Sequence, residues 1–312
     1  MTDEKRKPMQ LTLGPVQFNW EPETWRDFYF RIADEAPVDT VIVGEVVCSK
    51  RKPFLDKYLP EVLERLGSSG KKVFVGSLIL VTLERERRQA ADLAGQDLFP
   101  VEVNDITCLV NMGGKPHAIG PFINTYNEAT ASYFARNGAE RICLPPELPA
   151  ASVAAIVNAV PQAAMEVFAF GRVPLAISAR CYHARLHNLT KDNCKFVCDR
   201  DPDGLTVDTL DGEHFLAMNG VQTLSYTTVN LLNEARDLAR IGVKALRLSP
   251  QHCDMVEVAR VFRNVLDGNM SAATGNQALR EIYPQAVFTN GFAHGIPGSQ
   301  WVEQRLAALT GE

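Results

Sequence analysis

The chain lacks several features that would place it in a class at once. No apolar run approaches the roughly 18 residues that a membrane-spanning helix needs, and no apolar leader follows the polar residues 1–8. The 37 acidic and 32 basic residues are mixed along the chain, so no block of one sign forms a footprint for nucleic acid. We therefore expect a cytoplasmic protein with no membrane span and no nucleic-acid partner.

Motifs that assign an enzyme by their spacing are also missing. The sequence contains no His-Glu-x-x-His, no Walker phosphate loop, no Gly-x-Gly-x-x-Gly and no Gly-x-Ser-x-Gly. The absence of these motifs does not exclude a Ser-His-Asp triad, because the three residues need to be close only in space and not in the sequence. The sequence therefore leaves the catalytic residues unknown.

The 312 residues alternate between β-branched runs and helical patterns. This alternation favours a parallel sheet or barrel, and one α/β barrel commonly uses about 250 residues. We predict an α/β fold with one TIM-barrel-like (β/α) domain over residues 1–312. Strands are expected at residues 10–18, 39–45, 72–80, 99–103, 117–120, 141–144, 165–170 and 244–249. Helices are expected at residues 22–36, 60–66, 84–96, 106–110, 127–137, 149–160, 255–266 and 301–309.

A cysteine-bearing insertion at about residues 171–220 is expected to interrupt this alternation. Turn signals at Asp203-Gly204 and Asp211-Gly212 predict a β-hairpin within residues 199–220.

Seven cysteines are an odd number, which disfavours a disulfide scaffold and favours metal or redox chemistry. Cys181, Cys194 and Cys198 follow one predicted strand, with twelve and then three residues between them. Cys48 follows another predicted strand, and loops after barrel strands meet at one face. The four thiols are therefore candidate metal ligands. The alternative is that they are unrelated buried residues, since free cysteine often packs as a small apolar group.

The spacing leaves the identity of the metal open. Structural zinc sites usually combine two close cysteine pairs, whereas here one pair has three residues between its members and two thiols stand alone. Four thiolates also suit an iron-sulfur cluster. His183 and His187 could replace a thiolate if their segment is helical. Otherwise they either line the loop or are solvated.

Other side chains near these positions have more than one interpretation. Glu45 is either an acid-base group or a hydrogen-bond acceptor. Cys108 and Cys143 are expected in the core, and Cys253 is a further ligand candidate.

Three arginines crowd the cysteine segment, namely Arg172, Arg180 and Arg185. They could hold a carboxylate-bearing ligand through bidentate hydrogen bonds or balance the charge of a thiolate cluster. A third interpretation pairs them with the neighbouring acids Asp192, Asp199 and Asp201.

A longer pattern joins these residues. Residues 166–181 read EVFAFGRVPLAISARC, and Cys194 and Cys198 follow them. This stretch resembles the signature of the collagenase-like peptidase family, whose catalytic type is unsettled, and it is most similar to the family's ubiquinone-biosynthesis members. Supporting segments lie at residues 44–51, 144–148, 248–250 and 290–295, so the resemblance covers nearly the full chain.

The resemblance implies a barrel fold and an oxygen-sensitive 4Fe-4S cluster bound by Cys48, Cys181, Cys194 and Cys198. It further implies a heterodimer with the related protein UbiU, which acts in oxygen-independent hydroxylation of the ubiquinone precursor ring with prephenate as oxygen donor. We also expect a lipid-carrier protein as a partner. The alternatives are a collagenase-like peptidase and a non-catalytic subunit whose cluster stabilises an interface. Thiolates bound to iron cannot also attack a peptide bond, which argues against a cysteine nucleophile among the four.

Overall fold

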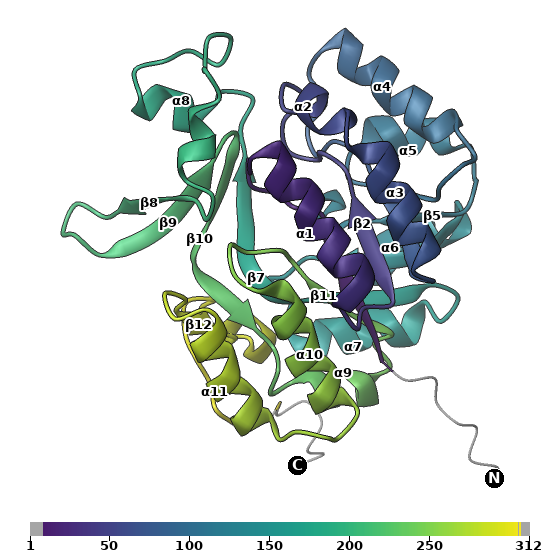
Figure 1. Ribbon diagram of the computed structural model, residues 1–312. Helices are drawn as coiled ribbons and strands as arrows, with labels where there is room; N and C mark the ends of the chain where they lie inside the picture. The colour runs from purple at the N-terminus through teal and green to yellow at the C-terminus, as the bar shows by residue number, and fades with distance from the viewer. Residues whose placement is uncertain (1–8, 305, 307–312) are drawn as a thin grey trace.

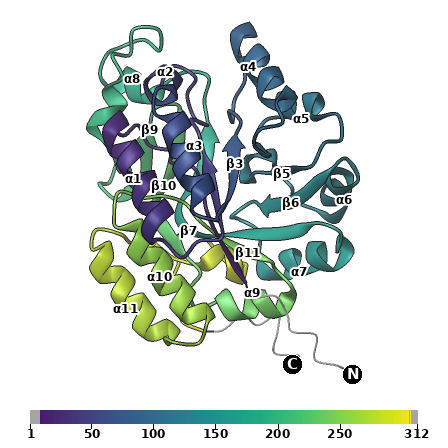
Figure 2. The same ribbon diagram turned by 45° about the vertical axis from the view of Figure 1, so that its right-hand side comes forward.

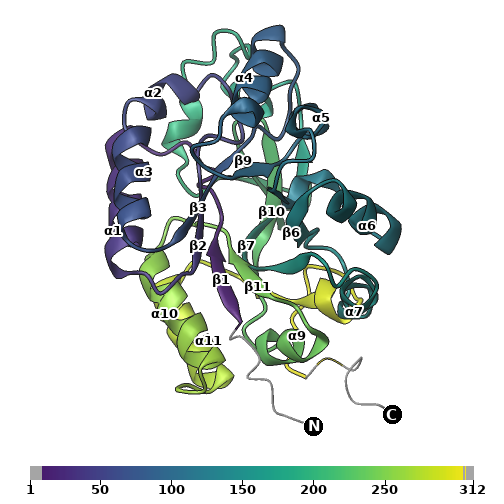
Figure 3. The ribbon, with the colours of Figure 1, turned by 90° about the vertical axis from the view of Figure 1, so that its right-hand side faces the viewer.

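Eight parallel strands close into a barrel at the centre of the computed structural model, which describes residues 9–304 and 306. Around the barrel the order is β1-β2-β3-β4-β5-β6-β7-β11, and β11 also pairs with β1 (Figures 1 and 3). The predicted TIM-barrel-like fold is confirmed. The bounds are β1 (Gln10–Leu13), β2 (Thr40–Val43), β3 (Lys72–Gly76), β4 (Val101–Val103), β5 (His117–Ile119), β6 (Ala139–Leu144), β7 (Ala164–Ile177) and β11 (Ala245–Leu248).

Helices cover the outside of the barrel (Figure 2). In α10, Asp254 caps the first turn by accepting hydrogen bonds from two backbone N–H groups, and Val258 and Phe262 lie one turn apart on the buried face. The helices are α1 (Pro22–Glu35), α2 (Lys52–Asp56), α3 (Leu59–Ser68), α4 (Glu84–Gly95), α5 (Ile106–Met112), η1 (Pro121–Ile123), α6 (Glu128–Arg136), α7 (Ala150–Ala159), α9 (Ala235–Ile241), α10 (Met255–Leu266), α11 (Ala272–Ile282) and η3 (Gly291–His294). No helix in residues 9–304 has the length and apolar character to cross a membrane.

Two features of the C-terminal part differ from the sequence prediction. Helix α11 was not predicted, because Gly275 lies inside it and masks its helical pattern. A Cβ at Gly275 would overlap the Leu232 side chain, so the glycine permits close helix packing. The helix predicted at residues 301–309 is wrong for residues 301–304, which are irregular. Residues 305 and 307–309 of that prediction lie outside the described residues.

The segment between β7 and α9 departs from the barrel pattern. The second half of β7 pairs antiparallel with β10 (Gln222–Asn230), and β9 (His214–Asn219) and β8 (Leu205–Asp208) extend this sheet. The predicted hairpin is present as β8 and β9, with Asp211-Gly212 in its turn. β12 (Phe288–Thr289) pairs with the other end of β10.

Three of the candidate cysteines lie in the segment before this hairpin, which contains α8 (Tyr182–Leu186) and η2 (Val197–Arg200). In Figure 1 this segment stands at the same end of the barrel as α2. The Phe54 ring of α2 lies 4.8 Å from the Phe196 ring, centroid to centroid, and this contact joins the two parts. The loop after β2 and the inserted segment therefore meet.

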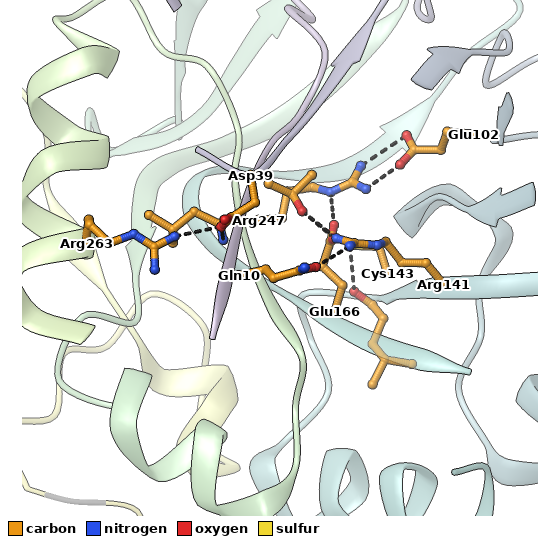
Figure 4. A network of polar contacts seen from close by, with 11 residues as sticks. Gln10, Asp39, Glu102, Arg141, Cys143, Glu166, Arg247 and Arg263 are labelled. Carbon is orange, nitrogen blue, oxygen red and sulfur yellow. Dashed lines mark hydrogen bonds and ion pairs between the residues drawn. The ribbon is translucent and has the colours of Figure 1, made fainter. Parts of the chain in front are cut away.

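Charged side chains fill part of the barrel interior (Figure 4). Arg247 on β11 pairs with Glu102 on β4 and with Glu166 on β7. Arg141 on β6 donates to the same Glu166 carboxylate at 2.8 Å, and the Thr12 hydroxyl on β1 donates at 2.7 Å. The network joins five barrel strands, and its two guanidinium groups balance its two carboxylates.

Candidate metal centre

The structure brings the four candidate cysteines to one end of the barrel. Cys48 lies in the loop after β2 and packs, together with Cys194, against a small apolar cluster that contains Cys181. The charge on Cys198 acts on both Cys48 and Cys181, and the charge on Cys194 acts on Cys181. Cysteines separated by more than 130 positions in the sequence therefore lie in one region of the structure, and their role as ligands of one metal centre stays a prediction.

The four sulfur atoms do not form a compact group. Among the described residues, no three of these sulfurs lie within 4.8 Å of one another. A tetrahedral zinc ion with bonds of about 2.3 Å would hold its four sulfurs roughly 3.8 Å apart. Within the described residues, the four thiols therefore contain no compact group of three that would match a preformed zinc site.

Burial raises the pKa of the Cys48 thiol, and the Arg51 guanidinium partly offsets this effect. Burial also raises the pKa of Cys181, and the hydrogen bond from the Ala184 backbone N–H, 3.4 Å from the sulfur, partly offsets it. Without a bound cation, both groups are therefore mainly protonated thiols near neutral pH.

Arg51 is the charged residue closest to this site that the sequence reasoning missed. Its side chain is 1% exposed and donates to the Gln17 carbonyl at 3.1 Å, to Asn219 Oδ1 at 2.7 Å and to Cys198 Sγ at 3.4 Å. Within the described residues it forms no ion pair with a carboxylate, and its Nε has no hydrogen-bond partner. Burial acts to lower the pKa of Arg51, but the negative charges of Cys198, Glu45 and Cys48 raise it.

Asn219 and Gly220 hold Arg51 in place. Asn219 accepts from Arg51, and its amide donates to the Cys198 and Asp201 carbonyls at 2.9 and 2.8 Å. Gly220 has φ +69°, and a Cβ there would overlap the Arg51 Nη2. Glycine therefore meets both a backbone and a spatial requirement at this position.

Glu45 shapes the loop that carries Cys48. Its buried carboxylate accepts from the backbone N–H groups of Val47 and Cys48, each at 2.8 Å. Burial raises the pKa of Glu45, and Arg51 opposes this shift. Of the two roles considered from the sequence, the structure shows the hydrogen-bond acceptor.

His183 and His187 lie beside the thiols, on α8 and at its C-terminal end. Their rings stack with centroids 5.5 Å apart, and His183 Nε2 lies 3.1 Å from Asp201 Oδ2. His183 is fully buried, so of the two non-ligand alternatives it lines the loop and is not solvated. Burial lowers the pKa of His183, and Asp201 together with the Met218 backbone opposes this shift.

The three arginines singled out in the sequence are not the charge partners of the thiols. Arg172 pairs with Asp203 at 3.2 Å, and Arg180 and Arg185 are exposed. Cys253 lies in the loop after β11, where Asp203 and Asp254 act on it instead of the other thiols.

Cys108 and Cys143 are fully buried within the barrel and its helices, so the prediction that they belong to the core is confirmed. Burial raises the pKa of Cys108 to about 11. Neither residue takes part in the four-cysteine site.

The fold is an eight-stranded parallel barrel, and the candidate thiols lie near the carboxyl ends of its strands. The protein therefore belongs to the general class of α/β-barrel proteins. The chain matches the model of peptidase family U32 over residues 25–303. That range includes all four candidate cysteines and every barrel strand except β1. The chain therefore belongs to peptidase family U32.

Proposed function

We propose that this chain is the iron-sulfur subunit of an oxygen-independent hydroxylase that acts on the ubiquinone precursor ring. This is the role of UbiV, which works as a heterodimer with UbiU. In this proposal Cys48, Cys181, Cys194 and Cys198 bind one 4Fe-4S cluster. The resemblance of residues 166–181 supports the hydroxylase role, and the surroundings of the thiols support the cluster.

The observation that carries the cluster is the buried Arg51. A guanidinium removed from water needs negative charge nearby, and the carboxylate whose charge acts on Arg51, in the described part of the chain, is the buried Glu45, which makes no direct ion pair with it. Its donor atom Nη2 lies 3.4 Å from Cys198 Sγ. Thiolates that bind iron remain anionic, so they would add negative charge in direct contact with this arginine, beyond what Glu45 supplies from a distance.

Among the described residues, no three of the four sulfurs lie as close together as the ligands of one tetrahedral zinc ion. A cluster holds each thiolate on a different iron and therefore needs a larger cavity than one tetrahedral ion. When bound, such a cluster would supply electron transfer or Lewis-acid activation. The chain's own contribution is hydrogen bonding to sulfur, from Arg51 and Asn19 to Cys198 and from Ala184 to Cys181.

A peptidase remains compatible with the family, but the thiols are poor candidates for its nucleophile. A cysteine nucleophile needs a lowered pKa and access to substrate, whereas burial raises the pKa of Cys48 and Cys181. We therefore place the hydroxylase first.

The test is hydroxylation without oxygen by this chain purified with a UbiU-like partner. The reaction contains the ubiquinone precursor and prephenate, with a lipid-carrier protein to present the apolar precursor, and mass spectrometry detects the added oxygen. We expect product from the wild-type complex and none when all four cysteines are alanine. Cys108→Ala serves as the control, because Cys108 is buried outside the site.

Three outcomes separate the alternatives. Hydroxylation by the four-alanine chain would contradict a role for the cluster. Peptide cleavage that survives the same substitutions would favour a peptidase. Loss of hydroxylation in variants that still form the heterodimer would exclude a subunit whose cluster only stabilises an interface.

A further inference from the structure

A second group of possible metal ligands lies beside the four thiols. One nitrogen from His183, one from His187 and one oxygen from Asp201 all lie within 4.8 Å of one another. The shortest of the measured separations, His183 Nε2 to Asp201 Oδ2, is 3.1 Å. The two histidines come from α8, and Asp201 comes from the residue that follows η2.

Three imidazole nitrogens of this group are buried without an aligned hydrogen bond, although the Asp201 carboxylate lies 3.1 Å from one of them. Neither ring nitrogen of His183 makes an aligned hydrogen bond within the described residues, although the side chain is fully buried. His187 Nε2 is also buried without a partner. A buried polar atom without a partner lowers the stability of a protein by about 1–3 kcal/mol. A metal ion would remove this penalty, because it accepts electron pairs from the ring nitrogens.

We propose that His183, His187 and Asp201 bind one divalent first-row transition-metal ion, of the Zn²⁺ or Fe²⁺ class, at a site distinct from the four-cysteine site. Two imidazoles and one carboxylate are the protein ligands of catalytic zinc and of non-haem Fe²⁺ centres. Three protein ligands leave further coordination positions for water or for an oxygen atom of a small ligand.

A bound ion would draw the three ligand atoms together. Metal–nitrogen bonds of about 2.0–2.1 Å place neighbouring ligand atoms roughly 3.4 Å apart, which is less than the 4.8 Å within which all three now lie. His187 is the C-cap of α8 and is partly exposed. The Asp201 backbone carbonyl is fixed by Asn219 at 2.8 Å and by the Gly204 N–H at 2.9 Å, which anchors the third ligand.

The positive charge of Arg51 disfavours a cation at this group of three residues, because its guanidinium acts electrostatically on His183. The Asp201 carboxylate, 3.1 Å from His183 Nε2, favours a cation at the same place. The inference rests on the three side chains themselves and does not depend on the proposed hydroxylase or on its cluster.

The test is a titration of the full chain with Co²⁺ under anaerobic conditions, followed by visible absorption. Co²⁺ held by nitrogen and oxygen shows ligand-field bands without the intense thiolate charge-transfer band that the cysteines would produce. We expect one such ion per chain in the wild type. We expect His187→Ala and Asp201→Asn each to weaken its binding by at least about tenfold, because loss of even an outer hydrogen-bond partner costs 10- to 100-fold.

The matched control is His214→Ala. His214 Nδ1 lies 2.6 Å from Asp208 on the exposed hairpin, so the same residue types are changed away from the site. This control should bind Co²⁺ as the wild type does. Circular dichroism without metal checks that each variant is folded, and Asp201→Asn preserves shape if His187→Ala does not fold.

Equal Co²⁺ binding by the wild type and by a folded His187→Ala or Asp201→Asn would overturn the proposal. So would a loss of binding in His214→Ala as large as in the site variants. A spectrum with thiolate charge transfer alone would assign the bound ion to the cysteines instead.

Discussion

The Glu166→Gln substitution should destabilise the barrel strongly. Glu166 opens the segment that identifies the family and is fully buried, with Arg247, Arg141 and Thr12 as its partners. Glutamine keeps the shape of the side chain but removes its charge, which leaves two buried guanidinium groups with only Glu102 as a carboxylate. Breaking a buried ion pair in this way costs about 3–5 kcal/mol.

The contribution of the ionised Glu166 to the free energy of unfolding should also depend on pH. Burial acts to raise the pKa of Glu166, but Arg247 and Arg141 outweigh it and lower the pKa from 4.5 to about 2. Because the folded pKa is depressed, this contribution is complete above pH 4.5 and is lost as the pH falls towards 2. A shift of this size corresponds to about 3 kcal/mol, which agrees with the cost of breaking the pair.

The assay is urea unfolding at neutral pH and at several acidic values. Glu257→Gln is the matched control, because Glu257 pairs with Arg260 on the surface, where the two side chains are 44% and 45% exposed. The control should lose less than about 1 kcal/mol, and Glu166→Gln should also lose the acid-dependent component. A loss no larger than that of Glu257→Gln would refute a stabilising role for the interior network.

Two further predictions concern the arginine beside the thiols. Arg51→Met should lower the amount of iron retained after exposure to a chelator, because it removes the positive charge beside Cys198. Arg51→Lys keeps that charge and should retain more iron than Arg51→Met. Equal retention by the wild type and both variants would contradict an electrostatic role for Arg51. Gly220→Ala should reduce both the free energy of unfolding, by at least about 1 kcal/mol, and the bound iron, because the new Cβ would displace the guanidinium. Its control is Gly212→Ala, which has a similar positive φ of +89° but no atom within 4 Å of the new Cβ, so it should lose stability and keep its iron.

Much of the fold was predictable because local signals agree with it. Helix α10 begins after the capping Asp254 and matches the predicted residues 255–266. The β-branched run in β2 is buried throughout, as a strand covered on both faces requires. The turn of the β8–β9 hairpin lies at a dipeptide that favours positive φ.

Other features depend on contacts between distant residues. The predicted strand at 165–170 continues to Ile177, because β10 pairs with residues around Pro174 that carry little strand signal of their own. Arg51 follows Ser49 and Lys50 in a segment typical of a solvated loop, and only the fold shows that it is buried.

The candidate site also combines a feature that the sequence predicts with one that depends on distant contacts. The position of Cys48 after a strand was enough to predict that it lies at the same end of the barrel as the inserted segment, and its role as a ligand stays a prediction. The approach of Asp201 to the histidine pair required the path of the chain through η2, which no spacing rule supplies.

Iron and sulfide content after anaerobic purification tests the central claim most directly. The account predicts about four irons and four labile sulfides per chain in the wild type and in Cys108→Ala. It predicts loss of the cluster in Cys48→Ala, since Cys48 is the one proposed ligand outside the inserted segment. Stoichiometric zinc without iron in the wild type, or an intact cluster in Cys48→Ala, would contradict the account.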